Sequence, residues 1–273
     1  MMEIETNHSG SSSSSGVMDV QAERGALLGQ VEAHVDLEYR AGMGMAVPTG
    51  LKMYGVRVPQ LRGIARDWQR AHKGVAREDL MAMVEALWDG GSREEKMLAL
   101  YLLQGHKRWI AGLAWGHFDR WRRGLDNWEV TDGLGVRTLG SWLLANPAAR
   151  LDRLWELIAD EEVWSRRLAL VATVWLNRGY GGFTAPDLTL GLIDRVKKER
   201  DPMITKAVSW ALREVAKIHP DRASAYVQEN GDVLAAHVVR EVSNKLCTGL
   251  KSGQDRGVAG DPAAGRAPEQ GGR

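Results

Sequence analysis

Arg167-Leu-Ala-Leu-Val171 shows the pattern that decides the fold, a charged residue followed by small and apolar residues on one helix face. Three other segments share this pattern: Lys96-Met-Leu-Ala-Leu100, Asp132-Gly-Leu-Gly-Val136 and Lys206-Ala-Val-Ser-Trp210. The four segments begin 36, 35 and 39 residues apart, which is enough chain for two helices and their turns. The spacing therefore predicts a repeat of helix pairs.

The sequence around these segments is helical in pattern throughout. Apolar residues recur at three and four positions, and alternating β-branched runs are missing. Helix breaks are expected at Gly90-Gly91-Ser92, at Asn146-Pro147, at 179–182 and at Asp201-Pro202. We therefore expect an all-α, HEAT-like helical-repeat solenoid, an α-α superhelix. Equivalent helices of such repeats line one concave face, and the first residue of each segment is expected along it.

Composition indicates a soluble globular protein. The chain has 273 residues, of which 44% are hydrophobic and 26% charged. No apolar run reaches the roughly 18 residues of a membrane span, and the N-terminus lacks a signal-peptide pattern. The single cysteine, Cys247, excludes an internal disulfide framework. We therefore expect an intracellular, cytoplasmic protein.

The two ends differ in composition from the middle. A serine run flanked by glycines marks residues 1–17 as a flexible tail. Residues 249–273 are rich in Gly, Ala, Pro and Arg, which predicts a disordered tail. The repeat domain is therefore expected over residues 18–248.

An unusual group of side chains lies on the expected inner helices. Trp128 and Asp132 are four residues apart, as are Lys206 and Trp210, so each pair shares a helix face. If the repeats stack in register, these residues converge with Arg167. A carboxylate there could stabilise the oxocarbenium-like sugar that forms when an N-glycosidic bond breaks. Indole faces attract cations, and an alkylated purine is cationic.

In that arrangement basic residues would surround the group, although the net charge of the chain is only +1. A guanidinium can hold a phosphate by two hydrogen bonds, and other cations supply sequence-independent backbone binding. The candidate DNA-binding residues are Arg166, Arg167, Lys206, Arg213 and Lys217. Two other interpretations remain open: Trp128 could be an ordinary core residue, and Asp132 with Arg167 could be a structural ion pair between repeats.

Four blocks of sequence resemble the AlkD-like family of DNA alkylation repair glycosylases. They are Tyr54-Gly-Val-Arg-Val-Pro-Gln-Leu-Arg-Gly-Ile-Ala65, Asn127-Trp-Glu-Val-Thr-Asp-Gly-Leu-Gly-Val-Arg-Thr-Leu-Gly140, Trp164-Ser-Arg-Arg-Leu-Ala-Leu170 and Ile204-Thr-Lys-Ala-Val-Ser-Trp-Ala-Leu-Arg-Glu-Val-Ala-Lys217. The similarity runs through residues 20–246, with the blocks in the family's order.

The resemblance implies an enzyme that excises cationic N3- and N7-alkylated purines from double-stranded DNA. It implies that Asp132 stabilises the cationic sugar and positions water. Trp128 and Trp210 would pack against the backbone and sugar at the lesion, and Arg167 would contact the DNA backbone. No cofactor, metal or obligate protein partner is implied, and we expect a monomer. His106, His117 and His219 lack ligand spacing.

The sequence departs from the family's pattern in residues 42–53. Ala46 stands where the family has an aromatic residue that touches DNA, which puts that contact in doubt. Two other functions therefore stay open. One is a non-catalytic HEAT-repeat protein that binds distorted or branched DNA. The other is a protein-binding solenoid, which would give no reason for Trp128, Asp132 and Trp210 to occur together.

Overall fold

The computed structural model describes residues 18–253, and this part of the chain is all-α. Outside its helices it holds one isolated parallel bridge, Lys52 with Ser92. Helix pairs follow one another as HEAT-like repeats, so the predicted fold class is confirmed. The predicted tail 1–17 and residues 254–273 of the other tail lie outside the described residues. None of the described helices is long and apolar enough to cross a membrane.

The chain divides between Ile110 and Ala111 into two compact units, here called unit 1 and unit 2. This boundary lies inside the segment predicted as one repeat domain. In unit 1, α1 packs on α3 and α4, and α5 packs on α3, α4 and α6. The helices of unit 1 are α1 (Val20–Glu32), α2 (Leu37–Ala46), α3 (Val58–Ala71), α4 (Arg77–Trp88), α5 (Arg93–Gly105) and α6 (Lys107–Ile110).

A buried carboxylate fixes the segment before α3. Glu94 accepts hydrogen bonds from the backbone N–H groups of Tyr54, Gly55 and Val56, at 3.1, 3.0 and 3.2 Å. Gly55 has φ +89°, and a Cβ there would lie 2.4 Å from the Cβ of Arg40. The glycine of the first family-like block is therefore required by its backbone angle and by a close approach to α2.

Lys96, the first residue of a repeat segment, lies in the interior. Its Nζ donates to the carbonyl of Trp88 at 2.7 Å and lies 4.6 Å from the centroid of the Trp88 ring. Only 6% of the residue is exposed. Lys96 is therefore not available to a ligand on the surface, because its ammonium group contacts α4.

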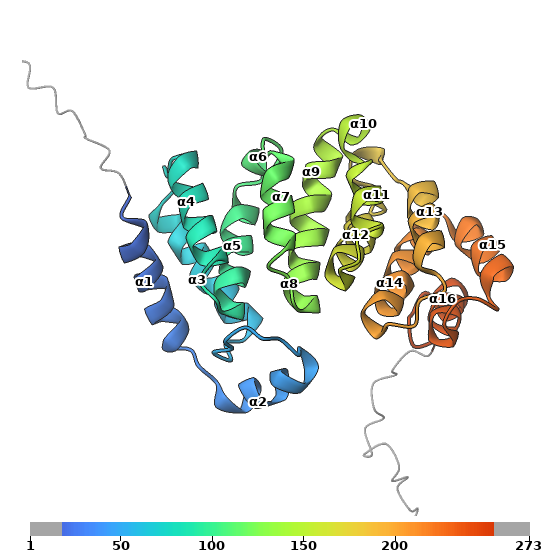
Figure 1. Ribbon diagram of the computed structural model, residues 1–273, viewed down its shortest axis with the longest axis horizontal. Coiled ribbons are helices and arrows are strands. Elements are labelled where there is room, and N and C mark those ends of the chain that lie inside the picture. The colour runs from blue at the N-terminus through green and yellow to red at the C-terminus, as the bar shows by residue number, and fades with distance from the viewer. Residues whose placement is uncertain (1–17, 254–273) are drawn as a thin grey trace, which may run out of the picture. The chain divides into compact units, whose positions relative to one another are not determined.

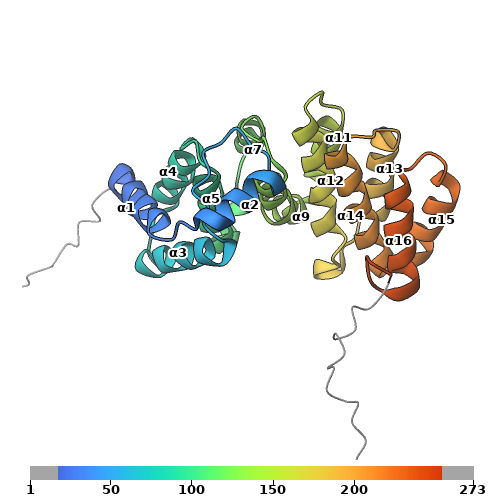
Figure 2. The ribbon, with the colours of Figure 1, turned by 90° about the horizontal axis from the view of Figure 1, so that it is seen from below.

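Unit 2 is built from two layers of helices. The helices α8, η1, α9, α12, α14 and α16 contact one another in chain order, and α11, α13 and α15 cover them. Figures 1 and 2 both show α14 between α12 and α16. The elements are α7 (Trp115–Arg122), α8 (Trp128–Gly133), η1 (Leu134–Leu139), α9 (Gly140–Ala145), α10 (Pro147–Arg150), α11 (Arg153–Ile158), α12 (Val163–Leu176), η2 (Tyr180–Gly182), α13 (Pro186–Val196), α14 (Pro202–Ile218), α15 (Pro220–Asn230) and α16 (Ala236–Thr248).

The predicted helix breaks are confirmed. Ser92 Oγ accepts from the N–H of Glu95 at 3.2 Å at the start of α5, and Asp201 Oδ1 accepts from the N–H of Met203 at 2.6 Å at the start of α14. Pro202 occupies the first turn of α14, where its missing N–H costs nothing. The breaks at 146–147 and at 179–182 separate α9 from α10 and α12 from α13.

Two glycines bring the inner helices of unit 2 into close contact. Added Cβ atoms would lie 2.4 Å from Val171 Cγ2 at Gly135 and 2.5 Å from Trp175 Cβ at Gly140. The two glycines are five residues apart and are bridged by the hydrogen bond from the N–H of Gly140 to the carbonyl of Gly135. A π-helical hydrogen bond joins residues that are five apart, so η1 places both glycines against α12.

Replacing Gly140 with alanine should destabilise the protein by about 1 to 3 kcal/mol, because the methyl group overpacks against Trp175. Gly116 on α7 is the matched control, since nothing lies within 4 Å of its added Cβ. Gly116→Ala should be neutral or raise stability by up to about 1 kcal/mol. Urea unfolding of both variants checks this, and equal effects would contradict the packing described.

Candidate functional site

The predicted catalytic carboxylate lies on a helix that runs without a break from α8 through η1 into α9. Asn127 caps the start: its Oδ1 accepts from the N–H of Val130 at 3.0 Å, and its carbonyl accepts from Thr131 Oγ1 at 2.6 Å. Gly133 and Gly140 keep helical backbone angles at both ends of the π segment. Asp132 therefore lies on a continuous helix, one turn after Trp128 and two residues before the π segment begins at Leu134.

Asp132 and Arg167 form a two-point ion pair. Arg167 Nε donates to Asp132 Oδ1 at 2.9 Å and Nη2 donates to Oδ2 at 2.8 Å. Arg167 Nη1 donates to the carbonyl of Met203 at 2.6 Å. The pair joins α8, α12 and α14, so the structure brings together the two residues whose convergence the repeat spacing predicts.

Burial differs between the two partners. The side chain of Arg167 is 6% exposed, and that of Asp132 is 16% exposed. Each carboxylate oxygen has two acceptor positions, and Arg167 uses one hydrogen bond on each oxygen. The carboxylate can therefore accept a further hydrogen bond, such as one from a water molecule.

The protonation of Asp132 is set by opposing effects. Burial raises the pKa of the Asp132 carboxyl, the hydrogen bonds and charge of Arg167 lower it, and the nearby charge of Glu129 raises it. The pKa lies above its ordinary value of 3.8, so burial outweighs the arginine. Arg167 is thus the group that opposes protonation of a carboxyl placed in a poorly hydrated site.

The two predicted tryptophans lie on the helices that the ion pair joins. Trp128 begins α8, one turn before Asp132, and is half-buried. Trp210 is also half-buried and lies on α14, seven residues after Met203. Seven residues are close to two helical turns, so Trp210 shares the face of α14 that carries Met203.

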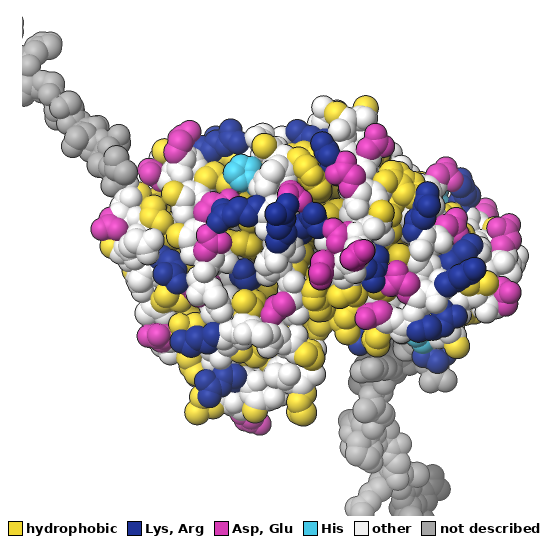
Figure 3. Space-filling model, in the orientation of Figure 1, with side chains coloured by type: hydrophobic (Ala, Val, Ile, Leu, Met, Phe, Trp, Pro, Cys, Tyr) yellow, Lys and Arg dark blue, Asp and Glu magenta, His cyan; other side chains and the backbone are white. Residues whose placement is uncertain are grey.

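The predicted DNA-binding residues differ in the hydrogen bonds and ion pairs that they make within the protein. Arg166 donates to the carbonyls of Asp160 and Glu161 and pairs with Glu199 at 3.1 Å. Arg213 pairs with Glu241 on α16 at 2.6 Å and donates to Ser209. On the face of unit 2 seen in Figure 3, Lys and Arg side chains lie beside Asp and Glu side chains.

The two lysines of that set are more accessible. Lys217 pairs with Glu214 at 2.7 Å while 47% of its side chain is exposed, and Lys206 on α14 is exposed. Lys206 is three residues after Met203 and four residues before Trp210, so it lies close to both along α14. In unit 1, Ala46 ends α2 and is exposed, and its neighbour Met45 is 83% exposed.

Sequence reasoning did not find two contacts of the site. One is the Met203 carbonyl, which the helix start at Asp201-Pro202 places in the first turn of α14, beside Arg167. The other is Arg122 on α7, which contacts the beginning of α12. No cluster of three or more His, Cys, Asp or Glu that could hold a metal occurs among residues 18–253.

The fold is that of an all-α HEAT-like repeat protein of the AlkD type. Residues 27–246 match the DNA alkylation repair enzyme family, and the chain belongs to it.

Two solved structures share the fold. A predicted DNA alkylation repair enzyme from Enterococcus faecalis aligns with a TM-score of 0.63 at 21% identity, covering 79% of this chain and 98% of that one. AlkD2 from Streptococcus mutans aligns with a TM-score of 0.51 at 13% identity, covering 77% and 89%. No curated protein sequence matches the chain.

Replacing Arg167 with glutamine should raise the pKa of Asp132 further, because the main effect that lowers it is lost. Breaking the buried pair should also destabilise the protein by about 3 to 5 kcal/mol. Carboxyl ¹³C NMR titration measures the pKa directly. Arg153→Gln is the control, since Arg153 pairs with Glu156 on the surface. An unchanged pKa of Asp132 in Arg167→Gln would show that the pair does not govern its protonation.

Proposed function

We propose that this protein is a DNA glycosylase that excises cationic N3- and N7-alkylated purines from duplex DNA. The observation that carries the proposal is the Asp132 carboxylate, which is mostly buried and paired with Arg167 through one hydrogen bond on each oxygen. Family membership supports action on alkylated DNA. No metal or cofactor enters the proposed reaction.

The chemistry follows from the charge that develops at the sugar. The bond between C1′ and the purine nitrogen breaks, its electron pair neutralises the cationic base, and positive charge builds on the sugar. Asp132 stabilises that charge more strongly in a poorly hydrated site than in water. Water then bonds to C1′ and gives up a proton to the solvent, which leaves the neutral free base and an abasic site.

The other side chains would hold the substrate. Trp128 and Trp210 offer indole faces to a cationic lesion and its sugar. Lys206 and Lys217 reach solvent and would bind phosphates, whereas Arg166 and Arg213 would first exchange their carboxylate partners for phosphate. Arg167 would have to do the same or donate its remaining N–H groups.

Replacing Asp132 with asparagine should lower the release of 7-methylguanine from methylated duplex DNA by about 10²- to 10³-fold, because the negative charge is lost while the side chain keeps its shape. Duplex binding should be unchanged or tighter. Glu129→Gln is the control on the same helix and should keep its excision activity.

If both wild type and Asp132→Asn release no base but bind duplex DNA, a non-catalytic DNA-binding protein replaces the glycosylase. If Asp132→Asn loses binding and excision equally, Asp132 has no role in the chemistry.

Replacing Lys206 with glutamine should weaken duplex binding and reduce the slope of log K against log salt by about 0.9, the value for one lost phosphate contact. Lys198→Gln is the matched control, because Lys198 is also exposed but lies before α14. Fluorescence anisotropy at several salt concentrations measures both slopes. Equal changes in the two variants would place the DNA elsewhere.

A further inference from the structure

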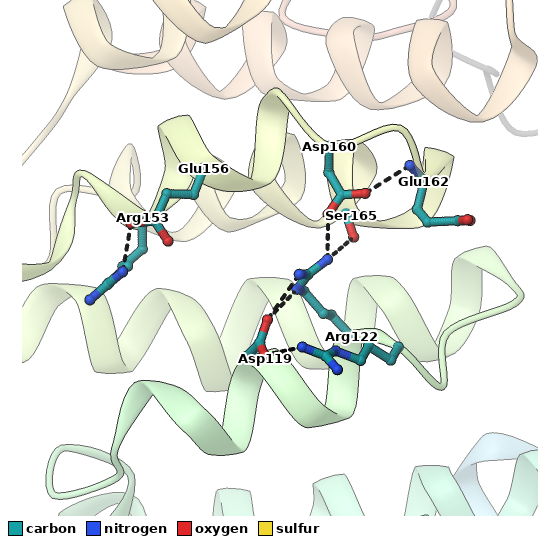
Figure 4. A network of polar contacts seen from close by, with 8 residues as sticks. Asp119, Arg122, Arg153, Glu156, Asp160, Glu162 and Ser165 are labelled. Carbon is teal, nitrogen blue, oxygen red and sulfur yellow. Dashed lines mark hydrogen bonds and ion pairs between the residues drawn. The ribbon is translucent and has the colours of Figure 1, made fainter.

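Arg122, at the end of α7, reaches the beginning of α12 (Figure 4). Its Nη1 donates to Ser165 Oγ at 3.0 Å and to Asp160 Oδ2. Its Nε and Nη2 each contact Asp119 Oδ1 at 2.9 Å. One guanidinium therefore ties α7 to the turn before α12 and to the first turn of α12 itself.

These contacts support the start of α12, where Arg166 also donates to the carbonyls of Asp160 and Glu161. Glu162 is the N-cap residue of α12, and its side chain makes no capping hydrogen bond to the part of the chain that the structure describes. Asp160 Oδ1 instead accepts from the N–H of Glu162 at 2.8 Å, and Asp160 is the residue that Arg122 holds. Ser165 is 1% exposed, so its contact with Arg122 is made in the interior.

This anchoring matters for Arg167 because of where it lies on α12. Arg167 follows Ser165 by two residues, which is about 3 Å along the helix axis and roughly the opposite side of the helix. Ser165 therefore faces Arg122 while Arg167 faces Asp132. A shift of α12 by one residue would move Arg167 by about 1.5 Å, enough to break hydrogen bonds of 2.8 and 2.9 Å.

We propose that Arg122 is a positioning residue that sets the register of α12 and so holds Arg167 on Asp132. The proposal rests on the proposed function for its effect on excision. Its effect on the ion pair stands independently, since α7, α8 and α12 all belong to unit 2. Arg122 acts through Arg167 and does not touch the reacting atoms.

The adjacent arginine offers a matched control. Arg123 also pairs with Asp119, at 2.7 Å, and its side chain is 70% exposed. Removing the Arg123 charge therefore perturbs the same aspartate, while the hydrogen bonds from Arg122 to Asp160 and Ser165 remain.

The test compares Arg122→Gln, Arg122→Lys and Arg123→Gln by carboxyl ¹³C titration of Asp132 and by single-turnover excision of 7-methylguanine across pH. Arg122→Gln should raise the pKa of Asp132, move the acidic limb of the rate profile to higher pH and lower the neutral-pH rate about tenfold. Its Kd for duplex DNA should stay within about twofold of wild type. Arg122→Lys keeps a cation for Asp160 and should recover the rate to within about threefold of wild type.

Arg123→Gln should leave the pKa and the rate as in wild type. If Arg122→Gln has the same Asp132 pKa and the same excision rate as Arg123→Gln, the proposal is overturned. This holds even when the melting temperature of Arg122→Gln falls, because Arg122 would then stabilise the fold without positioning Arg167. Should Arg122→Gln not fold, Ser165→Ala removes one of the contacts and should raise the pKa of Asp132 by a smaller amount. An unchanged pKa in Ser165→Ala would then overturn the proposal.

The two hypotheses fail in different ways. If wild type releases no base, the proposed function fails, but the titration of Asp132 still decides whether Arg122 holds the ion pair. If wild type excises the base and Arg122→Gln changes neither readout, only the positioning role fails.

Discussion

The ion pair between Asp132 and Arg167 is the interaction on which the site of unit 2 depends. A carboxylate that is 16% exposed tends to take up a proton unless a cation and hydrogen bonds hold it ionised. Both hydrogen bonds come from one guanidinium, whose third group binds Met203. The pair therefore exists only while α8, α12 and α14 keep their positions relative to one another. The close contacts of Gly135 and Gly140 with α12 matter for this reason.

The same burial serves two opposing needs of the proposed chemistry. A poorly hydrated carboxylate interacts strongly with a cationic sugar, but it is also the carboxylate most readily protonated. Arg167 reduces the conflict by lowering the pKa of Asp132, although burial still holds that pKa above its ordinary value, and it offsets part of the negative charge. The phosphates of bound DNA would compete for Arg167 and so change this balance when substrate arrives.

The sequence predicts the helices and the central pair because both depend on local spacing. Periodicity and the Ser92 and Asp201 caps locate helix starts, and the 35-residue step from Asp132 to Arg167 places them together. Contacts that depend on tertiary distance leave no such pattern. Arg213 is a predicted DNA-binding residue but forms an ion pair with Glu241, which is 28 residues further along the chain. Lys96 points into the interior and donates to the carbonyl of Trp88 on α4.

The central claim is that Asp132 stabilises positive charge at the sugar of the lesion. The most direct test is the Kd of wild type and Asp132→Asn for two duplexes, one with a cationic pyrrolidine abasic analogue and one with neutral tetrahydrofuran. Wild type should bind the cationic duplex at least tenfold more tightly, and Asp132→Asn should lose that preference. Equal affinity of wild type for the two duplexes, or the same preference in Asp132→Asn, would contradict the account.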